Sequence, residues 1–139
     1  MPFGHVDKFV EMEVTNLMSV AMGLNVSNHD TISQAENGKQ FLADSRLRFQ
    51  YGATIARTLT SLLDEVKAPN FIELLSLDVE GNEFAVLKGL DFNRYKTKWI
   101  LAEVRSPEIE AHLNNFSYRK HSLLTENESY ADVLLLSCT

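Results

Sequence analysis

The chain has 139 residues, 45% of them hydrophobic and 23% charged, which suits one ordinary globular domain spanning residues 1–139. Its formal net charge of −6 disfavours a nucleic-acid partner. The single cysteine, the lack of a signal peptide and the lack of a membrane-length apolar segment predict a cytoplasmic protein with no membrane partner.

Residues 1–57 carry the weaker structural signals. From Val6 to Leu24 apolar residues recur at helical spacing, but within residues 10–14 they alternate with acids, as in a strand. Both interpretations remain open, and the helix is slightly favoured. Residues 25–52 are polar, with a weak strand predicted over residues 39–42 or 47–51.

The second part of the chain carries clearer signals for where helices and strands begin and end. A short helix from Thr58 to Val66 has Thr58 or Thr60 as its cap and is stopped by Pro69. The near-continuous apolar run from Phe71 to Val79 predicts a strand buried on both faces. The elements expected after it are a helix over 83–90, a strand over 99–104, a helix over 106–114 capped by Ser106 with Pro107 at its first position, and an antiparallel strand pair over 118–124 and 130–137.

This order predicts an α/β fold with a mostly parallel sheet, right-handed crossovers and an antiparallel C-terminal strand. Ligands of such sheets bind beyond the carboxyl ends of the parallel strands. Asp78, Glu80 and Glu103 all fall there, so we expect three carboxylates to converge on one side of the sheet.

Carboxylates in this position have several chemical uses. They can ligate a hard divalent cation, accept hydrogen bonds from a substrate, or act as a general base. A structural alternative is that Asp78 or Glu80 caps the helix that begins near Glu83, where negative charge is favourable. The four histidines show no metal-ligand spacing, so the histidines predict no metal site.

Four segments together resemble the FkbM methyltransferase family. They read TLTSLL at Thr58–Leu63, LSLDVEGNE at Leu75–Glu83 and VLKG at Val86–Gly89, and the fourth is the strand that closes in Glu103. The resemblance divides the chain into a divergent part, residues 1–57, and an FkbM-like part, residues 58–139.

The resemblance implies a Rossmann-like class I methyltransferase fold, truncated at its N-terminus. It also implies S-adenosylmethionine as cofactor and O-methylation of a small-molecule or glycan hydroxyl. On this basis Asp78, Glu80 and Glu103 are the candidate catalytic residues, and a divalent metal at these acids is an open alternative.

The chain departs from such enzymes in its glycines. The fold holds its cofactor with a Gly-rich loop after the first strand, and here no two glycines are spaced for that loop; they stand at Gly4, Gly23, Gly38, Gly52, Gly81 and Gly89. A non-catalytic binding or assembly module is therefore the alternative function, and a metal-assisted enzyme of another class is a third.

The apparent lack of the first strands has a structural consequence. The strand from Ile72 to Val79 would have one open, apolar edge, and such edges tend to pair with another strand. We expect the N-terminal segment or a second copy of the chain, in a homo-oligomer, to cover it.

Overall fold

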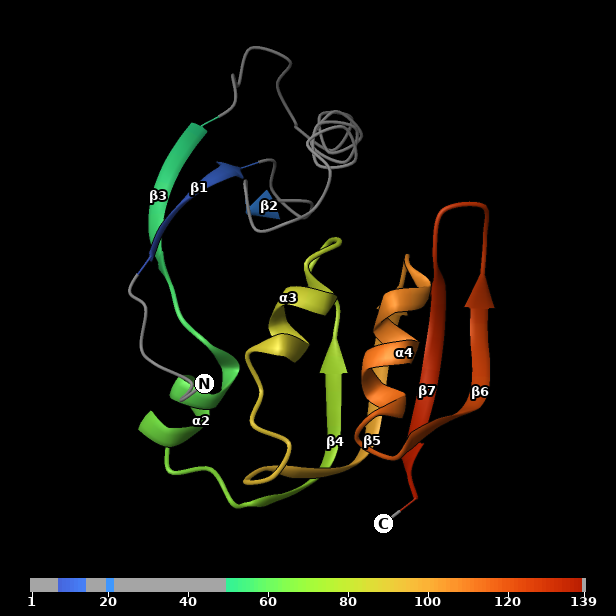
Figure 1. Ribbon diagram of the computed structural model, residues 1–139. Coiled ribbons are helices and arrows are strands. Elements are labelled where there is room, and N and C mark those ends of the chain that lie inside the picture. Colours follow the sequence, from blue (N-terminus) through green and yellow to red (C-terminus); the bar gives the residue numbers. More distant parts are fainter. Residues whose placement is uncertain (1–7, 15–19, 22–49, 139) are drawn as a thin grey trace. The chain divides into compact units, whose positions relative to one another are not determined.

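The computed structural model describes residues 8–14, 20–21 and 50–138, with side-chain environments from Ile55 onward (Figure 1). These residues form two compact units. One contains the described residues from Thr58 to Asp78 and from Glu83 onward, and the other contains the described residues before Thr58 together with Val79–Asn82. No helix in the described part of the chain combines the length and hydrophobicity of a membrane span.

The first unit along the chain contains a three-stranded antiparallel sheet in the order β2-β1-β3. Its strands are β1 (Lys8–Val14), β2 (Val20–Ala21) and β3 (Gln50–Ala56). The β1–β3 ladder runs unbroken from Lys8↔Ala56 to Val14↔Gln50.

This sheet corrects the prediction for the N-terminal region. The strand alternative is right for residues 8–14, and the favoured helix is wrong there. The alternation of apolar and acidic residues correctly indicated the strand. The spacing could not decide between strand and helix, because β1 is stabilised by β3, a partner strand far along the chain. The weak strand predicted over 47–51 meets β3 at Gln50, and the one over 39–42 lies outside the described residues.

The helix predicted after Arg57 is present as α2 (Leu59–Glu65). Its N-cap is Thr58 rather than Thr60, since the Thr58 hydroxyl accepts a hydrogen bond of 3.2 Å from the Ser61 N–H. The chain leaves the helix through Lys67, which has a positive φ of 52°.

The larger unit contains a mixed four-stranded sheet in the order β4-β5-β7-β6 (Figure 1). Only β4 and β5 are parallel, and the other two pairings are antiparallel. The bounds are β4 Phe71–Leu77, β5 Lys96–Val104, β6 Tyr118–Glu126 and β7 Ala131–Ser137.

The α/β class and the C-terminal antiparallel pair are therefore correct, but the mostly parallel sheet is wrong. Strand spacing does predict the β6–β7 hairpin. It does not reveal that β7 inserts between β5 and β6, and this insertion makes two of the three pairings antiparallel.

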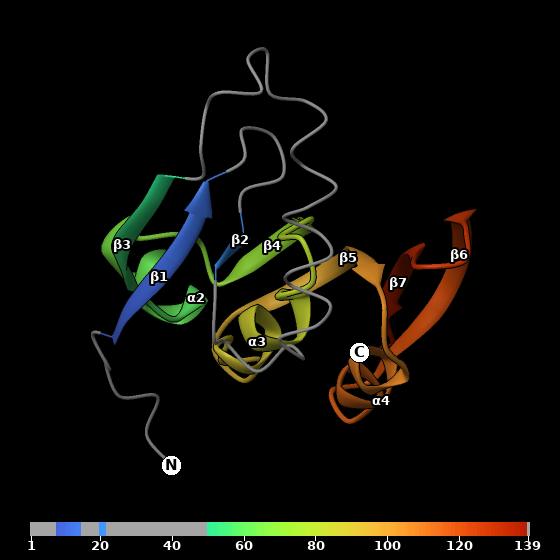
Figure 2. The ribbon, with the colours of Figure 1, turned by 90° about the horizontal axis from the view of Figure 1, so that it is seen from above.

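Two helices, α3 (Glu83–Lys88) and α4 (Pro107–Asn114), cover one face of this sheet (Figure 2). As predicted, Ser106 caps α4 and Pro107 stands in its first turn. Both helices contact β5 and each other, and the apolar core lies between them and the sheet. The core consists of Leu77, Leu87, Leu90, Phe92, Tyr95, Ile100, Ala102, Ile109, Leu113, Tyr118, Val133 and Leu135.

Strand β4 is more exposed than its sequence predicts. Phe71 is 55% exposed and Leu74 is 53% exposed, so the prediction of burial on both faces is wrong for the described structure. The reason is that, among the strands that the structure describes, β4 ends the sheet and pairs with β5 alone.

The single tryptophan of the chain, Trp99, lies on β5 and is half-buried. Its ring meets the ring of His121, on β6, edge to face with the centroids 5.0 Å apart. The contact links an inner strand of the sheet to its far edge.

Candidate functional site

The site is built where the parallel pair β4–β5 ends. The last register pair is Leu77 with Ala102, so Asp78 and Glu103 are the next residues of the two strands. Because the strands run in the same direction, these two acids leave the sheet at the same edge.

Three carboxylates converge at this edge. The oxygens of Asp78, Glu83 and Glu103 lie within 4.8 Å of one another. Glu83 is 1% exposed and Glu103 is 6% exposed, whereas Asp78 is exposed to solvent. Of the three, Asp78 is therefore the one that a dissolved ligand reaches first.

The structure thus brings together two of the three predicted residues. Glu80 is not a member of the group and lies in the turn between β4 and α3, with a φ of 52°. Gly81 follows with a φ of 90°, so two consecutive left-handed residues make this turn.

Glu83 is the member that the sequence prediction left out. It opens α3, where the positive end of the helix favours a carboxylate. The available signal was the last acid of the LDVEGNE segment, since a helix beginning directly after a strand-ending turn brings its first residue back toward the strand end.

A cation lies beside this group. The Arg105 guanidinium forms an ion pair with the Glu103 carboxylate.

Two kinds of chemistry suit the arrangement. Hard divalent cations prefer several carboxylate oxygens at such spacing. Equally, an exposed carboxylate backed by two buried ones can hold an acceptor hydroxyl and take its proton. The donor set fits both uses.

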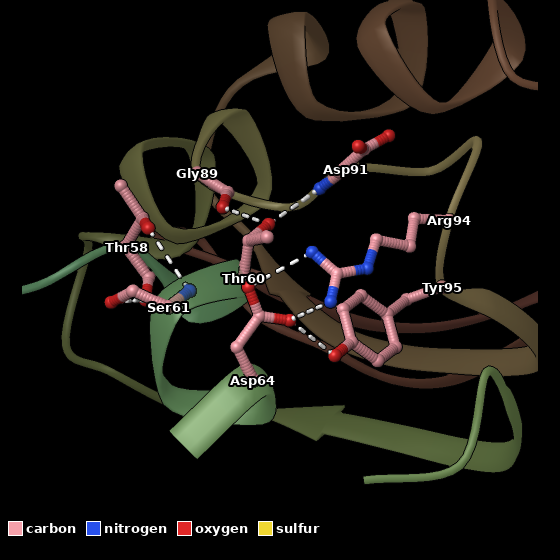
Figure 3. Close-up of polar contacts among 8 residues, drawn as sticks. All are labelled: Thr58, Thr60, Ser61, Asp64, Gly89, Asp91, Arg94 and Tyr95. Atoms are coloured by element: carbon pink, nitrogen blue, oxygen red, sulfur yellow. Dashed lines mark hydrogen bonds and ion pairs between the residues drawn. The ribbon is translucent and has the colours of Figure 1, made fainter. Parts of the chain in front are cut away.

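A second polar cluster joins α2 to the segment after α3 (Figure 3). The Thr60 hydroxyl donates to the Gly89 carbonyl over 2.8 Å and accepts from the Asp91 N–H over 2.7 Å. The Thr60 N–H also donates to the Gly89 carbonyl over 3.1 Å. Two residues of the FkbM-like segments, Thr60 and Gly89, therefore hold elements together and are not members of the acidic group.

The same cluster contains Asp64 of α2 (Figure 3). Its carboxylate receives both terminal nitrogens of Arg94, at 2.6 and 2.9 Å, and the Tyr95 hydroxyl at 2.5 Å. The hydrogen bond to Asp64, and then burial, raise the pKa of Tyr95 above its ordinary value.

The described glycines do not form a cofactor loop. Gly52 lies within the β1–β3 ladder, Gly81 makes the turn before α3, and Gly89 ends that helix. A Cβ at Gly89 would stand 3.3 Å from the Thr58 Cβ, so close packing explains this glycine. The described residues thus do not supply the glycine loop that S-adenosylmethionine requires in Rossmann-like enzymes.

Comparison with protein families gives one finding. The model of the methyltransferase FkbM domain matches residues 8–134, which includes the N-terminal strands as well as the acidic group. Comparisons with curated proteins and with solved structures found no match.

Proposed function

Because this chain belongs to the methyltransferase FkbM domain family, we propose that it takes part in S-adenosylmethionine-dependent O-methylation of a small-molecule or glycan hydroxyl. The parallel β4–β5 pair with its helices supports an assignment to the C-terminal half of a Rossmann-like class I fold. The observation that carries the proposal is the convergence of Asp78, Glu83 and Glu103 at the carboxyl end of that pair.

The three acids have different roles in this proposal. Asp78 is exposed, so it binds the acceptor hydroxyl and accepts its proton as the oxygen is methylated. Glu83 and Glu103 are buried and fix the position and charge of the group around it. Glu80 shapes the turn that carries the chain from β4 to α3.

The test is methyl transfer by the full chain to a panel of sugars and polyols, measured as formation of S-adenosylhomocysteine. We expect Asp78→Asn to lower the rate by about 10²- to 10⁴-fold, the usual contribution of a general base. Glu108→Gln, an exposed acid in the first turn of α4, is the matched control and should leave the rate unchanged. A folded Asp78→Asn variant with full activity would refute the assignment of Asp78.

One observation favours a second function, a binding or assembly module without cofactor. It is the spacing of the glycines, none of which forms a G-x-G pair. Calorimetric titration of the full chain with S-adenosylhomocysteine separates the two functions, because the module releases no binding heat. Activity that is lost on chelation and restored by Mg²⁺ would instead indicate a cation at the acidic group.

We also infer a reducing compartment such as the cytoplasm for this protein. The single cysteine, Cys138, is a free and exposed thiol, which agrees with such a compartment.

A further inference from the structure

His112 joins the two helices that cover one face of the larger sheet (Figure 2). Its ring, on α4, meets the ring of Phe84, on α3, edge to face with the centroids 5.6 Å apart. It also hydrogen-bonds to the backbone of Leu87, on the same helix. The rings of Phe92 and Phe116 enclose it from two further segments. A titratable ring therefore makes part of the contact between α3 and α4.

The hydrogen bonds of this ring suit its neutral form. The ring donates to the Leu87 carbonyl, a bond that by itself raises the pKa of His112. The other nitrogen, Nε2, is buried and has no hydrogen-bond partner among the described residues. In the neutral ring Nε2 is an acceptor, whereas in the protonated ring it is an N–H donor. A proton on His112 thus places an unsatisfied donor and a charge among aromatic side chains.

A cation beside the ring adds to this cost. The Lys88 Nζ lies 4.6 Å from the centroid of the Phe84 ring, so a protonated His112 would bring a second positive charge to the same phenyl group. The attraction of a cation to the face of that ring is already satisfied by the lysine. Burial, and then the charge of Lys88, lower the pKa of His112.

The other titratable groups of the elements around His112 have different partners or face solvent. Glu110 of α4 pairs with Lys120 of β6 over 3.8 Å, and Asp91 accepts the Asn93 N–H over 3.0 Å. The rest are Glu83 on α3, Glu108 on α4, Tyr118 and Arg119 on β6, and Lys96, Lys98 and Glu103 on β5. The charge that shifts the pKa of His112 is that of Lys88.

We propose that His112 is a pH-sensitive latch between α4 and α3: the neutral ring holds the helices together, and protonation of the ring releases α3. Release admits water to the Nε2–H and separates the imidazolium from Lys88. The latch is closed at neutral pH and opens as the pH falls, because the closed form binds the proton less well than an exposed histidine does.

The latch also has a consequence for the candidate site. Glu83, a member of the acidic group, is the first residue of α3, so release of this helix disturbs the group. The regulatory meaning of the latch rests on the proposed function, whereas the opening of α3 can be measured without it.

The experiment measures backbone amide exchange by NMR in the full chain between about pH 7.5 and 5, relative to an unstructured chain at the same pH. The reporters are Gly89 and Leu90, whose N–H groups donate to the carbonyls of Val86 and Leu87 over 3.0 and 3.1 Å. Below about pH 6.5, and down to the lowered pKa of the closed form, their protection should fall by up to about tenfold per pH unit. Protection of the β5 amides should fall less, because the sheet stays folded when α3 is released.

Three variants make the test specific. His112→Gln keeps a donor for the Leu87 carbonyl but takes up no proton, so protection at the two reporters should lose this pH dependence. His121→Gln, at the exposed histidine of β6, is the matched control and should retain it. Lys88→Gln removes the second cation and should reduce the loss of protection on acidification. The lysine variant decides the question if His112→Gln does not fold.

An equal loss of protection in β5 and at the two reporters would overturn the proposal, because it would indicate unfolding of the whole unit. A loss as steep in His112→Gln as in His121→Gln, or an unchanged loss in Lys88→Gln, would do the same. The outcome is separate from that of the proposed function. Acid release of α3 in a chain that transfers no methyl group would retain the latch and reject methyl transfer. An active chain whose α3 stays protected would do the reverse.

Discussion

His112, on α4, is a half-buried titratable residue whose ring packs among aromatic side chains. Its ring meets those of Phe84, Phe92 and Phe116, with centroids 5.6, 6.0 and 5.2 Å away. Its Nε2 is buried without a hydrogen-bond partner among the described residues. Burial, and to a lesser degree the charge of Lys88, lower the pKa of His112, while a hydrogen bond to the Leu87 backbone opposes them.

This environment predicts that the free energy of unfolding decreases as the pH is lowered. Because the pKa of His112 is lowered by folding, the unfolded chain binds more protons between the folded value and the ordinary one. The stabilisation is complete above about pH 6.5 and is lost as pH falls through the folded pKa. Urea unfolding between about pH 7.5 and 5 should show this loss, and His112→Gln should reduce its slope.

The exposed His121 provides the control for this prediction. His121→Gln should leave the His112-dependent loss in place. An equal loss in wild type and His112→Gln would contradict the prediction. The sequence identified the histidines as packing or surface residues rather than metal ligands, but not which of them is enclosed, because the rings around His112 come from three separate segments.

At the scale of elements, polar side chains help to hold α2 to the rest of its unit. Leu62 and Val66 are 44% and 71% exposed, so apolar burial on this short helix is incomplete. Thr60 is 94% buried by the same measure and binds both Gly89 and Asp91. Its hydroxyl is therefore a principal link between α2 and the end of α3.

Thr60→Val keeps the shape of the side chain but leaves the Asp91 N–H and the Gly89 carbonyl without the hydroxyl. We expect a loss of about 1 to 3 kcal/mol in the free energy of unfolding, the usual cost of unsatisfied buried groups. Thr60→Ser keeps the hydroxyl and should lose much less. Equal unfolding midpoints in urea for the valine variant and wild type would show that water replaces these bonds.

How much of each element the sequence could predict depends on where its stabilising contacts lie. The caps Thr58 and Ser106 act within one helical turn, and both were predictable. β1 depends on β3 across a long stretch of chain, so local spacing left it open between strand and helix. The place of β7 depends on packing against β5, and local spacing missed it. Likewise, Asp78 and Glu103 could be predicted to lie together because both follow the ends of parallel strands. The place of Glu83 could not, because it depends on the direction in which α3 leaves its turn.

At the scale of the whole molecule, the two edges of the larger sheet differ. The β6–β7 ladder contains register shifts at Lys120/Ser122 and Leu123/Thr125, and β6 carries Arg119 and Lys120, which are features that discourage edge pairing. The β4–β5 ladder has no such shift. The one charged residue of β4, Glu73, is paired with Lys98 at 3.3 Å. Within the described part of the chain, β4 is therefore the edge more suited to pairing with another strand.

We expect a second copy of the chain to pair along β4. Sedimentation velocity should show a dimer whose population increases with concentration, since the exposed Phe71 and Leu74 are buried by the pairing. Leu74→Lys should shift the protein to monomer, and Leu124→Lys, at an equally exposed position on β6, should not. A wild-type chain that stays monomeric at every concentration would contradict this prediction.

Trp99, whose ring contacts His121, is an intrinsic fluorescent probe of the larger sheet. The chain has a single indole, so its fluorescence comes from one known place, the inner strand β5. Unfolding transfers a half-buried ring to water, which shifts its emission to longer wavelength. Unfolding of this sheet can thus be followed by the fluorescence of the native chain, with no added label.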